Sequence, residues 1–264
     1  MVRLAEGTEV LVLCGGKGTR IREETQFRPK PMVDIGDRPL LWHLLRHYRW
    51  HGARDFLLCL GYKGEIIRDY FLNYRRATAD LRIDLSTGEV KILGQPEEPT
   101  DWRVSMVDTG DESMTGLRIL KALPHIKGKR FLATYGDGLA DIDIEALMRH
   151  HCQHGKLATV TAVRPSSRFG EITIAGGQVT GFREKPQVSD GWINGGFFVF
   201  EKDAFCREDF GSNPVLETDI LTRLADAGEL SAFPHRGFWQ CMDTYREAQL
   251  LNELWASGQA PWAC

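Results

Sequence analysis

The chain has 264 residues, of which 42% are hydrophobic, so it can bury a substantial core as one large α/β domain or two small ones. Its formal charge of −3 gives no general basic field, which argues against binding to nucleic acid by bulk electrostatics. Six cysteines without Cys-x-x-Cys pairing, no amino-terminal signal pattern and no long apolar run predict a chain of the reducing cytoplasm that does not cross a membrane.

The first predicted element is a buried strand at residues 9–13, and the glycine-rich stretch Cys-Gly-Gly-Lys-Gly-Thr-Arg follows it at 14–20. Glycines permit close approach of a ligand, and backbone N–H groups exposed in such a turn form a concavity for anions. Arg20 and Lys30 add two positive charges nearby. The spacing fits neither the dinucleotide fingerprint nor the Gly-Lys-Ser/Thr phosphate loop. We therefore predict a phosphate site of another kind.

Apolar periodicity along the rest of the chain predicts alternating helices and strands. The predicted helices cover residues 39–51, 63–74, 115–123, 143–154, 214–227 and a last segment that reaches 255. The predicted strands cover 55–60, 104–108, 131–138, 157–163, 197–200 and 231–234, with β-hairpins at 79–102 and 170–183. This order is typical of a mostly parallel sheet covered by helices on both faces.

The hairpin at 79–102 interrupts the α/β pattern and has a tail rich in Pro and Glu at 95–100. Inserted hairpins of this kind often contact a neighbouring subunit or cover a substrate. We expect the hairpin at 79–102 to contact a neighbouring subunit or to cover the substrate.

Asp137 follows the strand at 131–138, within the run Tyr-Gly-Asp-Gly. Because ligands in open α/β sheets bind outside the carboxyl ends of the strands, Asp137 and the glycine stretch are expected to meet at one crevice. A lone Asp beside glycines is more often a turn former than a metal ligand. Three further candidate ligands, His150, His151 and His154, lie at the end of the 143–154 helix, where we expect a solvated helix terminus rather than a metal site.

Five motifs in order give the chain a family resemblance. The glycine stretch with Pro-Lys-Pro-Met at 29–32 resembles the signature of the sugar-1-phosphate nucleotidylyltransferases, and the spacer at 21–28 is most similar to that of glucose-1-phosphate cytidylyltransferases. Tyr-Gly-Asp-Gly at 135–138, Glu-Lys-Pro at 184–186 with Asn-Gly-Gly at 194–196, and the closing segment at 237–244 resemble the remaining family motifs. The resemblance covers nearly the whole chain.

This resemblance implies a Rossmann-like fold, a mixed and mostly parallel central sheet flanked by helices with inserted β-hairpins, as in the nucleotide-diphospho-sugar transferase fold. It implies one domain over 1–264, with a nucleotide-binding part at 9–140 and a sugar-phosphate-binding part at 141–264. The implied enzyme joins CTP and α-D-glucose 1-phosphate, by Mg²⁺-assisted in-line attack, into CDP-glucose and pyrophosphate. We expect a cytoplasmic homo-oligomer whose partners are these small molecules and neither nucleic acid nor membrane.

By the same resemblance, the catalytic residues are Arg20, Lys30, Asp137, Lys185 and Asp243, and Asp137 and Asp243 hold the Mg²⁺ ion. The implied nucleotide-binding residues are Leu13, Cys14, Gly15, Gly16, Lys17, Gly18, Thr19, Arg20, Lys30, Ser113, Arg118 and Gly136. The implied sugar-phosphate-binding residues are Tyr135, Glu184, Lys185, Trp192 and Asn194.

Several alternatives remain open at this point. The same motifs suit dTTP or UTP as the nucleotide, and another sugar phosphate or phosphorylated small molecule as the acceptor. A non-catalytic sensor of nucleotide sugars is a further alternative, although it would be expected to lose the carboxylates and basic groups that this chain retains. Asp243 also suits the N-cap of the last helix, and Cys241 stands where cytidylyltransferases usually have proline, a change that can loosen the turn around Asp243.

Overall fold

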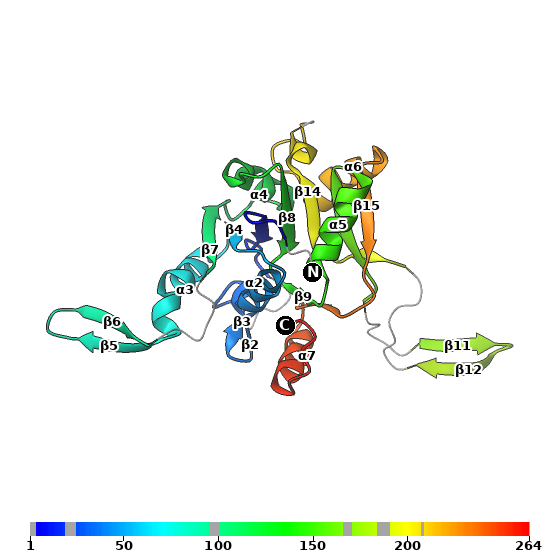
Figure 1. Ribbon diagram of the computed structural model, residues 1–264. Helices are drawn as coiled ribbons and strands as arrows, with labels where there is room; N and C mark the ends of the chain where they lie inside the picture. The colour runs from blue at the N-terminus through cyan, green and yellow to red at the C-terminus, as the bar shows by residue number, and fades with distance from the viewer. Residues whose placement is uncertain are drawn as a thin grey trace.

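The computed structural model describes residues 4–18, 25–94, 101–165, 171–183, 191–206 and 209–263, with the backbone alone at 171–175 and 182–183. Its centre is an eight-stranded sheet in the order β13-β10-β14-β8-β1-β4-β7, with β15 paired to β10 (Figure 1). These strands are β1 (Glu9–Leu13), β4 (Asp55–Leu60), β7 (Arg103–Asp108), β8 (Arg130–Tyr135), β10 (Ala158–Val163), β13 (Ile193–Asn194), β14 (Phe198–Glu201) and β15 (Leu230–Pro234).

The sheet is mixed, as expected. The pairs β1–β4, β1–β8, β4–β7 and β10–β15 are parallel. By contrast, β14 runs antiparallel to β8 and to β10, and β13 runs antiparallel to β10. The parallel strands β1, β4, β7 and β8 therefore bring their carboxyl ends to one edge of the sheet, where the glycine stretch and Asp137 both follow.

Helices cover both faces of the sheet because its central strands are apolar on both sides. Val10 and Val12 of β1 belong to a core that also contains residues of α2 (Leu40–Trp50), α3 (Gly64–Ala77), α5 (Ile144–His154) and α7 (Tyr245–Ala256). Leu11 and Leu13, the alternate residues of the same strand, belong to a second core with α4 (Thr115–Ala122) and α6 (Thr222–Asp226). This double coverage agrees with the predicted architecture.

Short elements complete the chain. They are the 3₁₀ turns η1 (Lys30–Met32), η2 (Leu123–His125) and η3 (Lys202–Phe205), the π-helix η4 (Leu216–Leu221) and the paired strands β2 (Asp34–Ile35) with β3 (Arg38–Pro39) and β9 (Gly138–Ala140) with β16 (Trp239–Cys241). The predicted helix at 214–227 is thus shorter than expected, and its first part is wound as a π-helix before α6 begins.

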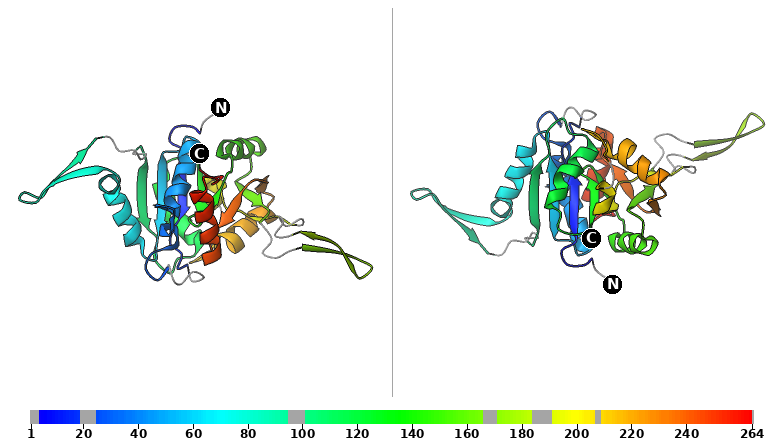
Figure 2. Two further views of the ribbon diagram at one scale, coloured as in Figure 1. Left: turned by 90° about the horizontal axis from the view of Figure 1, so that it is seen from below. Right: turned by 90° about the horizontal axis from the view of Figure 1, so that it is seen from above.

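Both predicted hairpins are present. They consist of β5 (Asp80–Asp84) with β6 (Glu89–Leu93) and of β11 (Glu171–Ala175) with β12 (Gln178–Arg183). They extend from opposite sides of the body, and the views from below and above in Figure 2 keep them apart. The tail at 95–100 lies outside the described residues.

The three histidines at the end of α5 correct one expectation. His151 is fully buried, with Nδ1 2.8 Å from Thr159 Oγ1 and Nε2 3.3 Å from Glu201 Oε1, instead of lying at a solvated helix end. His154 Nε2 lies 2.7 Å from the same Thr159 hydroxyl, and His150 Nε2 lies 3.1 Å from Ser231 Oγ. These histidines therefore attach α5 to the sheet. Over the described part of the chain, no helix has the length and apolar character needed to span a bilayer.

Candidate active site

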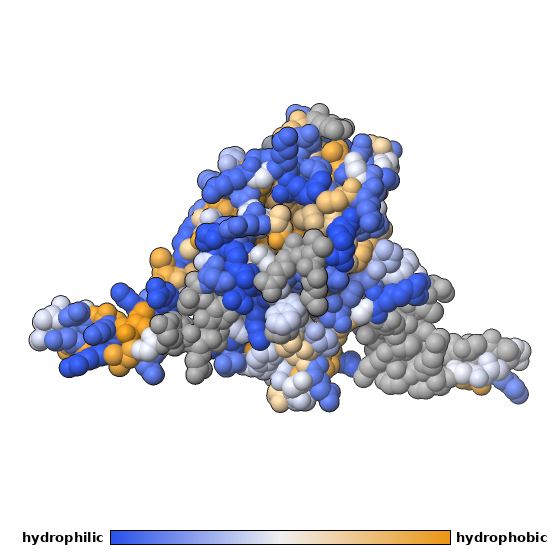
Figure 3. Space-filling view, in the orientation of Figure 1, coloured by the Kyte–Doolittle hydropathy of each residue, from blue (hydrophilic) through white to orange (hydrophobic). Residues whose placement is uncertain are grey.

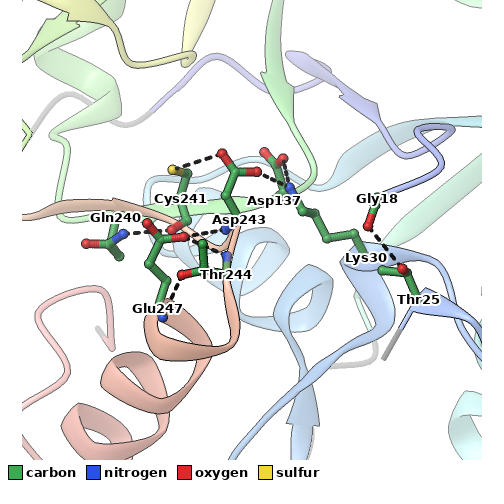
Figure 4. A network of polar contacts seen from close by, with 9 residues as sticks. All are labelled: Gly18, Thr25, Lys30, Asp137, Gln240, Cys241, Asp243, Thr244 and Glu247. Carbon is green, nitrogen blue, oxygen red and sulfur yellow. Dashed lines mark hydrogen bonds and ion pairs between the residues drawn. The ribbon is translucent and has the colours of Figure 1, made fainter. Parts of the chain in front are cut away.

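The glycine stretch turns away from the carboxyl end of β1. The Cys14 N–H still donates to Cys59 O at 3.0 Å, which extends the pairing with β4 by one residue. At the far end, Gly18 has a positive φ of 58°, a conformation that favours glycine, and the Thr25 hydroxyl donates to its carbonyl at 3.0 Å (Figure 4). Thr19 and Arg20 lie outside the described residues.

Arg118 supports this turn from behind. Its buried guanidinium donates to Gly15 O at 2.9 Å and also to Leu60 O, Thr109 Oγ1, Gly110 O and Asp111 O. A Cβ atom added at Gly15 would lie 2.1 Å from Arg118 Nη1, so only glycine accommodates this contact. Arg118 thus links α4 to the loops after β1, β4 and β7, an arrangement that the sequence did not reveal.

Lys30 lies between the two predicted metal-binding carboxylates. Its ammonium nitrogen is 2.8 Å from Asp137 Oδ2 and also contacts Asp243 Oδ1, as Figure 4 shows. Only 8% of the Lys30 side chain and backbone surface is exposed. Burial acts to lower the pKa of Lys30, but the two carboxylates outweigh burial and raise that pKa above its usual value. The residue therefore carries its charge at neutral pH.

Two distant segments bring these carboxylates together. Asp137 follows β8, and the Met242 N–H donates to its backbone carbonyl at 2.8 Å. Antiparallel pairing of β16 with β9 places the closing segment beside this turn. The N-cap of α7 is Thr244, not Asp243, because Thr244 and Glu247 form a complete capping box. Glu247 Oε2 also accepts from the Asp243 N–H at 2.7 Å, which fixes the backbone of Asp243.

Cys241 contacts Asp243 from the end of β16. Its thiol lies 3.8 Å from Asp243 Oδ2, and burial raises the pKa of this thiol to about 12, so it stays protonated and can donate. Cys241 itself pairs with Gly138 where β16 leads into the turn that carries Asp243. The Asp243 carboxylate therefore remains beside Asp137.

The donor set is suitable for Mg²⁺. Oxygens of Asp137 and Asp243 converge on one point, which the Lys30 ammonium occupies in this structure, so a metal ion bound there would take the place of that ammonium. Within the described ranges, no group of three or more His, Cys, Asp or Glu side chains converges in this way. Two carboxylates suit Mg²⁺, which typically takes one or two protein carboxylates and completes its shell with water and substrate phosphates.

A cavity of about 380 Å³ unites most of the predicted nucleotide-binding residues. It is lined by Leu13, Cys14, Gly15, Gly16, Lys17, Gly18, Lys30, Pro31, Asp111, Glu112, Ser113, Met114, Thr115, Arg118, Tyr135, Gly136 and Asp137. At its rim, exposed Lys17 pairs with Glu112 at 2.6 Å. The Ser113 hydroxyl donates to Thr109 O and accepts from Lys121 Nζ at 3.0 Å.

The predicted sugar side is only partly described. Tyr135 lines the cavity, and the Asn194 amide donates to its hydroxyl at 2.9 Å. Trp192 is 38% exposed and lies outside the cavity lining, with the Arg164 guanidinium 4.6 Å and the Arg236 guanidinium 5.5 Å from its ring. Glu184 and Lys185 lie outside the described residues.

Sequence reasoning missed Glu217, which accepts hydrogen bonds from the Tyr135 hydroxyl and, at 2.8 Å, from Thr115 Oγ1. Nothing in its local sequence marks it, because its partners lie 82 and 102 residues away. Its position in a π-helix is a structural signal, since such segments are frequent at functional sites.

Comparisons with known proteins show the family and the fold of the chain. The family model described as "Nucleotidyl transferase" matches residues 9–247. The glucose-1-phosphate cytidylyltransferase of Salmonella typhimurium is 46% identical over 255 residues, which cover 96% of this chain and 98% of the relative. A probable glucose-1-phosphate cytidylyltransferase of Bacillus subtilis is 44% identical over 254 residues, with the same coverage. Among solved structures, HddC from Yersinia pseudotuberculosis in complex with GMP-PN has a TM-score of 0.70 at 22% identity, covering 94% of this chain and 99% of that chain, which shows the shared fold.

Proposed function

Because the chain belongs to the nucleotidyl transferase family, we propose that it joins CTP and α-D-glucose 1-phosphate into CDP-glucose and pyrophosphate. The observation that carries this proposal is the meeting of Lys30, Asp137 and Asp243 beside the cavity that the glycine stretch lines. The two cytidylyltransferase relatives, at 46% and 44% identity over nearly their whole length, support the choice of substrates.

The reaction needs charge neutralisation more than acid–base catalysis. A sugar 1-phosphate has a second pKa of about 6 and is largely dianionic at neutral pH, so its attacking oxygen needs no general base. The barrier is the approach of two polyanions in line with the leaving pyrophosphate. Bound by Asp137 and Asp243, Mg²⁺ would neutralise part of the triphosphate charge.

The basic residues have distinct proposed roles. Lys30 lines the cavity, and its ammonium stabilises charge that develops on the α-phosphate. Arg20 binds the departing β- and γ-phosphates, and Lys185 holds the phosphate of the incoming sugar, a role that suits the compact charge of lysine. Ser113 and Arg118 border the nucleotide, while Glu184, Trp192 and Asn194 bind the hexose. Arg118 acts chiefly by holding the Gly15 carbonyl.

A substrate panel tests the proposal. Purified protein is incubated with Mg²⁺, glucose 1-phosphate and CTP, UTP, dTTP, GTP or ATP in turn, and pyrophosphate release is measured. We expect CTP to give the highest kcat/KM. A preference for dTTP or UTP would overturn the base assignment and retain the chemistry. With CTP fixed, mannose 1-phosphate and galactose 1-phosphate test the sugar assignment in the same way.

We also infer the domain organisation of the enzyme and its location in the cell. One domain would divide into a nucleotide-binding part at 9–140 and a sugar-phosphate-binding part at 141–264. The five described cysteines are free thiols, which supports a cytoplasmic location.

We further propose a homo-oligomer in which a second copy covers the β5–β6 hairpin. Ile83, Leu85 and Leu93 are 53%, 91% and 42% exposed there, and Leu72 on α3 nearby is 74% exposed. Figure 3 shows this apolar surface as orange patches on the arm at the left. Light scattering of the wild type and of Ile83→Asp checks this assignment: we expect an oligomer that the substitution dissociates, and a monomeric wild type would contradict it.

A further inference from the structure

We propose that Glu217 is a positioning residue for the sugar half of the site, because its carboxylate fixes the hydrogen bonds of Tyr135 and, through Tyr135, the amide of Asn194. The inference rests on the proposed function, since it concerns how the same site holds its sugar phosphate. Glu217 itself does not line the cavity, whereas Tyr135 and Thr115 do.

The carboxylate is an acceptor with two donors. The Tyr135 hydroxyl donates to Glu217 Oε1, and the Thr115 hydroxyl donates to Oε2 at 2.8 Å. Thr115 Oγ1 in turn accepts from the Leu216 N–H at 2.9 Å, so the first turn of η4 is attached to the start of α4. An ionised carboxyl group can only accept hydrogen bonds, so both hydroxyl protons must point toward Glu217.

The direction of these bonds determines how Asn194 lies. Because the Tyr135 proton points to Glu217, the Tyr135 oxygen accepts from Asn194 Nδ2 at 2.9 Å. Asn194 Oδ1 accepts from the Gly196 N–H at 2.9 Å, which agrees with the same amide orientation. Among the described residues, one N–H and one lone pair of the exposed Asn194 amide then remain for a ligand that offers both a donor and an acceptor. Neighbouring sugar hydroxyls have this character.

Tyr135 also connects this network to the proposed catalytic centre. It is the last residue of β8, and Asp137 follows two residues later. The Tyr135 hydroxyl donates to Glu217 Oε1 and accepts from Asn194 Nδ2, so it lies between the carboxylate and the amide. Tyr135 thereby fixes the position of the Asn194 amide relative to the turn that carries Asp137.

A glutamine at position 217 disturbs this arrangement without removing volume. Its amide nitrogen must direct an N–H at either Tyr135 or Thr115, and the hydroxyl that it faces must reverse its bond. Reversal at Tyr135 conflicts with the Asn194 amide, which already donates to the same oxygen. Reversal at Thr115 meets the Leu216 N–H, which already donates to Thr115 Oγ1, and so disturbs the attachment of η4 that holds position 217 beside Tyr135. We therefore expect Glu217→Gln to impair sugar recognition while nucleotide recognition is kept.

The test compares binding of CDP-glucose and of CDP by calorimetry, in the wild type, Glu217→Gln, Tyr135→Phe and the double variant. We expect each single substitution to raise Kd for CDP-glucose about tenfold and to leave Kd for CDP within about twofold. The double variant should resemble the more impaired single variant, because both changes break the same chain of hydrogen bonds. Asp226→Asn, which removes a charge from exposed α6, should match the wild type.

Two results would overturn the inference: an equal loss of affinity for CDP and CDP-glucose in Glu217→Gln, or multiplicative effects in the double variant. If Glu217→Gln does not fold, Tyr135→Phe still tests the hydrogen-bond chain from Glu217 through Tyr135 to Asn194, because this variant keeps the bond between Glu217 and Thr115. Steady-state kinetics give a second reading, in which KM for glucose 1-phosphate rises and KM for CTP does not. An inactive wild type would refute the proposed function, whereas an active wild type with an unaffected Glu217→Gln would refute only this inference.

Discussion

Lys30 and Arg118 are two buried cations that border the same cavity in different surroundings. Lys30 faces two carboxylates, which compensate the cost of burying its charge. Arg118 donates to five oxygens of the backbone and of Thr109, so its planar guanidinium is committed to the loops that form the cavity wall. Lys30 is therefore placed to act on the substrate, whereas Arg118 stabilises the cavity wall.

Replacing Lys30 by Gln should lower kcat about a hundredfold or more, because it removes a preorganised donor at the α-phosphate. Lys129→Gln, an exposed lysine, serves as the matched control and should leave kcat unchanged. Steady-state rates of pyrophosphate release check both variants. A Lys30→Gln enzyme within twofold of the wild type would remove Lys30 from the mechanism.

Two adjacent glycines should respond differently to alanine. A Cβ at Gly15 would overlap the Arg118 guanidinium at 2.1 Å, whereas a Cβ at Gly16 would meet nothing within 4 Å. We expect Gly15→Ala to lower the free energy of unfolding by about 1–3 kcal/mol through overpacking and Gly16→Ala to change it by less than about 0.5 kcal/mol. Urea denaturation measures both, and equal stabilities would show that Arg118 is not held as described.

Among the helices and strands, the sequence predicts the features that neighbouring residues determine, such as strand bounds and helix caps. The apolar run at 55–60 forms β4 with the expected bounds, and Asp143 caps α5 by accepting from the Ala146 N–H at 2.8 Å. Contacts across the sequence were not predictable. The buried ring of His151 contacts Glu201, which is 50 residues away, and η4 departs from the α-helix where Glu217 meets distant partners. Periodicity reports which face of a helix is apolar, not which polar groups will meet there.

The start of α7 connects helix stability with the proposed metal site. Thr244→Ala removes the side-chain acceptor of the capping box and should lower the free energy of unfolding by about 1 kcal/mol. Because Asp243 precedes this cap, the apparent affinity for Mg²⁺ should fall as well. Gln249→Ala, at an exposed position of the same helix, is the control for both measurements. If Thr244→Ala lowers stability but leaves the Mg²⁺ dependence unchanged, the capping box does not influence the metal site, which would contradict this prediction.

At the scale of the whole molecule, buried histidines make stability depend on pH. Burial lowers the pKa values of His43, His47 and His151 from 6.5 to about 4. In the unfolded chain they bind protons near pH 6.5, so the unfolded state takes up more protons between pH 6.5 and 4. This difference stabilises the fold fully above that window and is lost as pH falls through it.

Each histidine should therefore contribute a slope of about 1.4 kcal/mol per pH unit within the window. Urea unfolding of the wild type and of His47→Gln between pH 7 and 4.5 tests this expectation, with a shallower pH dependence predicted for the variant. Glutamine retains a donor for the Ile142 carbonyl that His47 Nε2 contacts at 2.9 Å. Parallel curves for the two proteins would contradict the assignment to His47.

The whole molecule arranges parallel strands so that the glycine stretch and Asp137 emerge at one edge, and the closing segment adds Asp243 there. We propose that CDP-glucose is made at this edge. Mass spectrometry of the products formed from CTP, glucose 1-phosphate and Mg²⁺ tests it directly, with the wild type beside Asp137→Asn. We expect CDP-glucose and pyrophosphate in equal amounts from the wild type and almost none from the variant. No CDP-glucose from a folded wild type, or equal yields from both proteins, would contradict it.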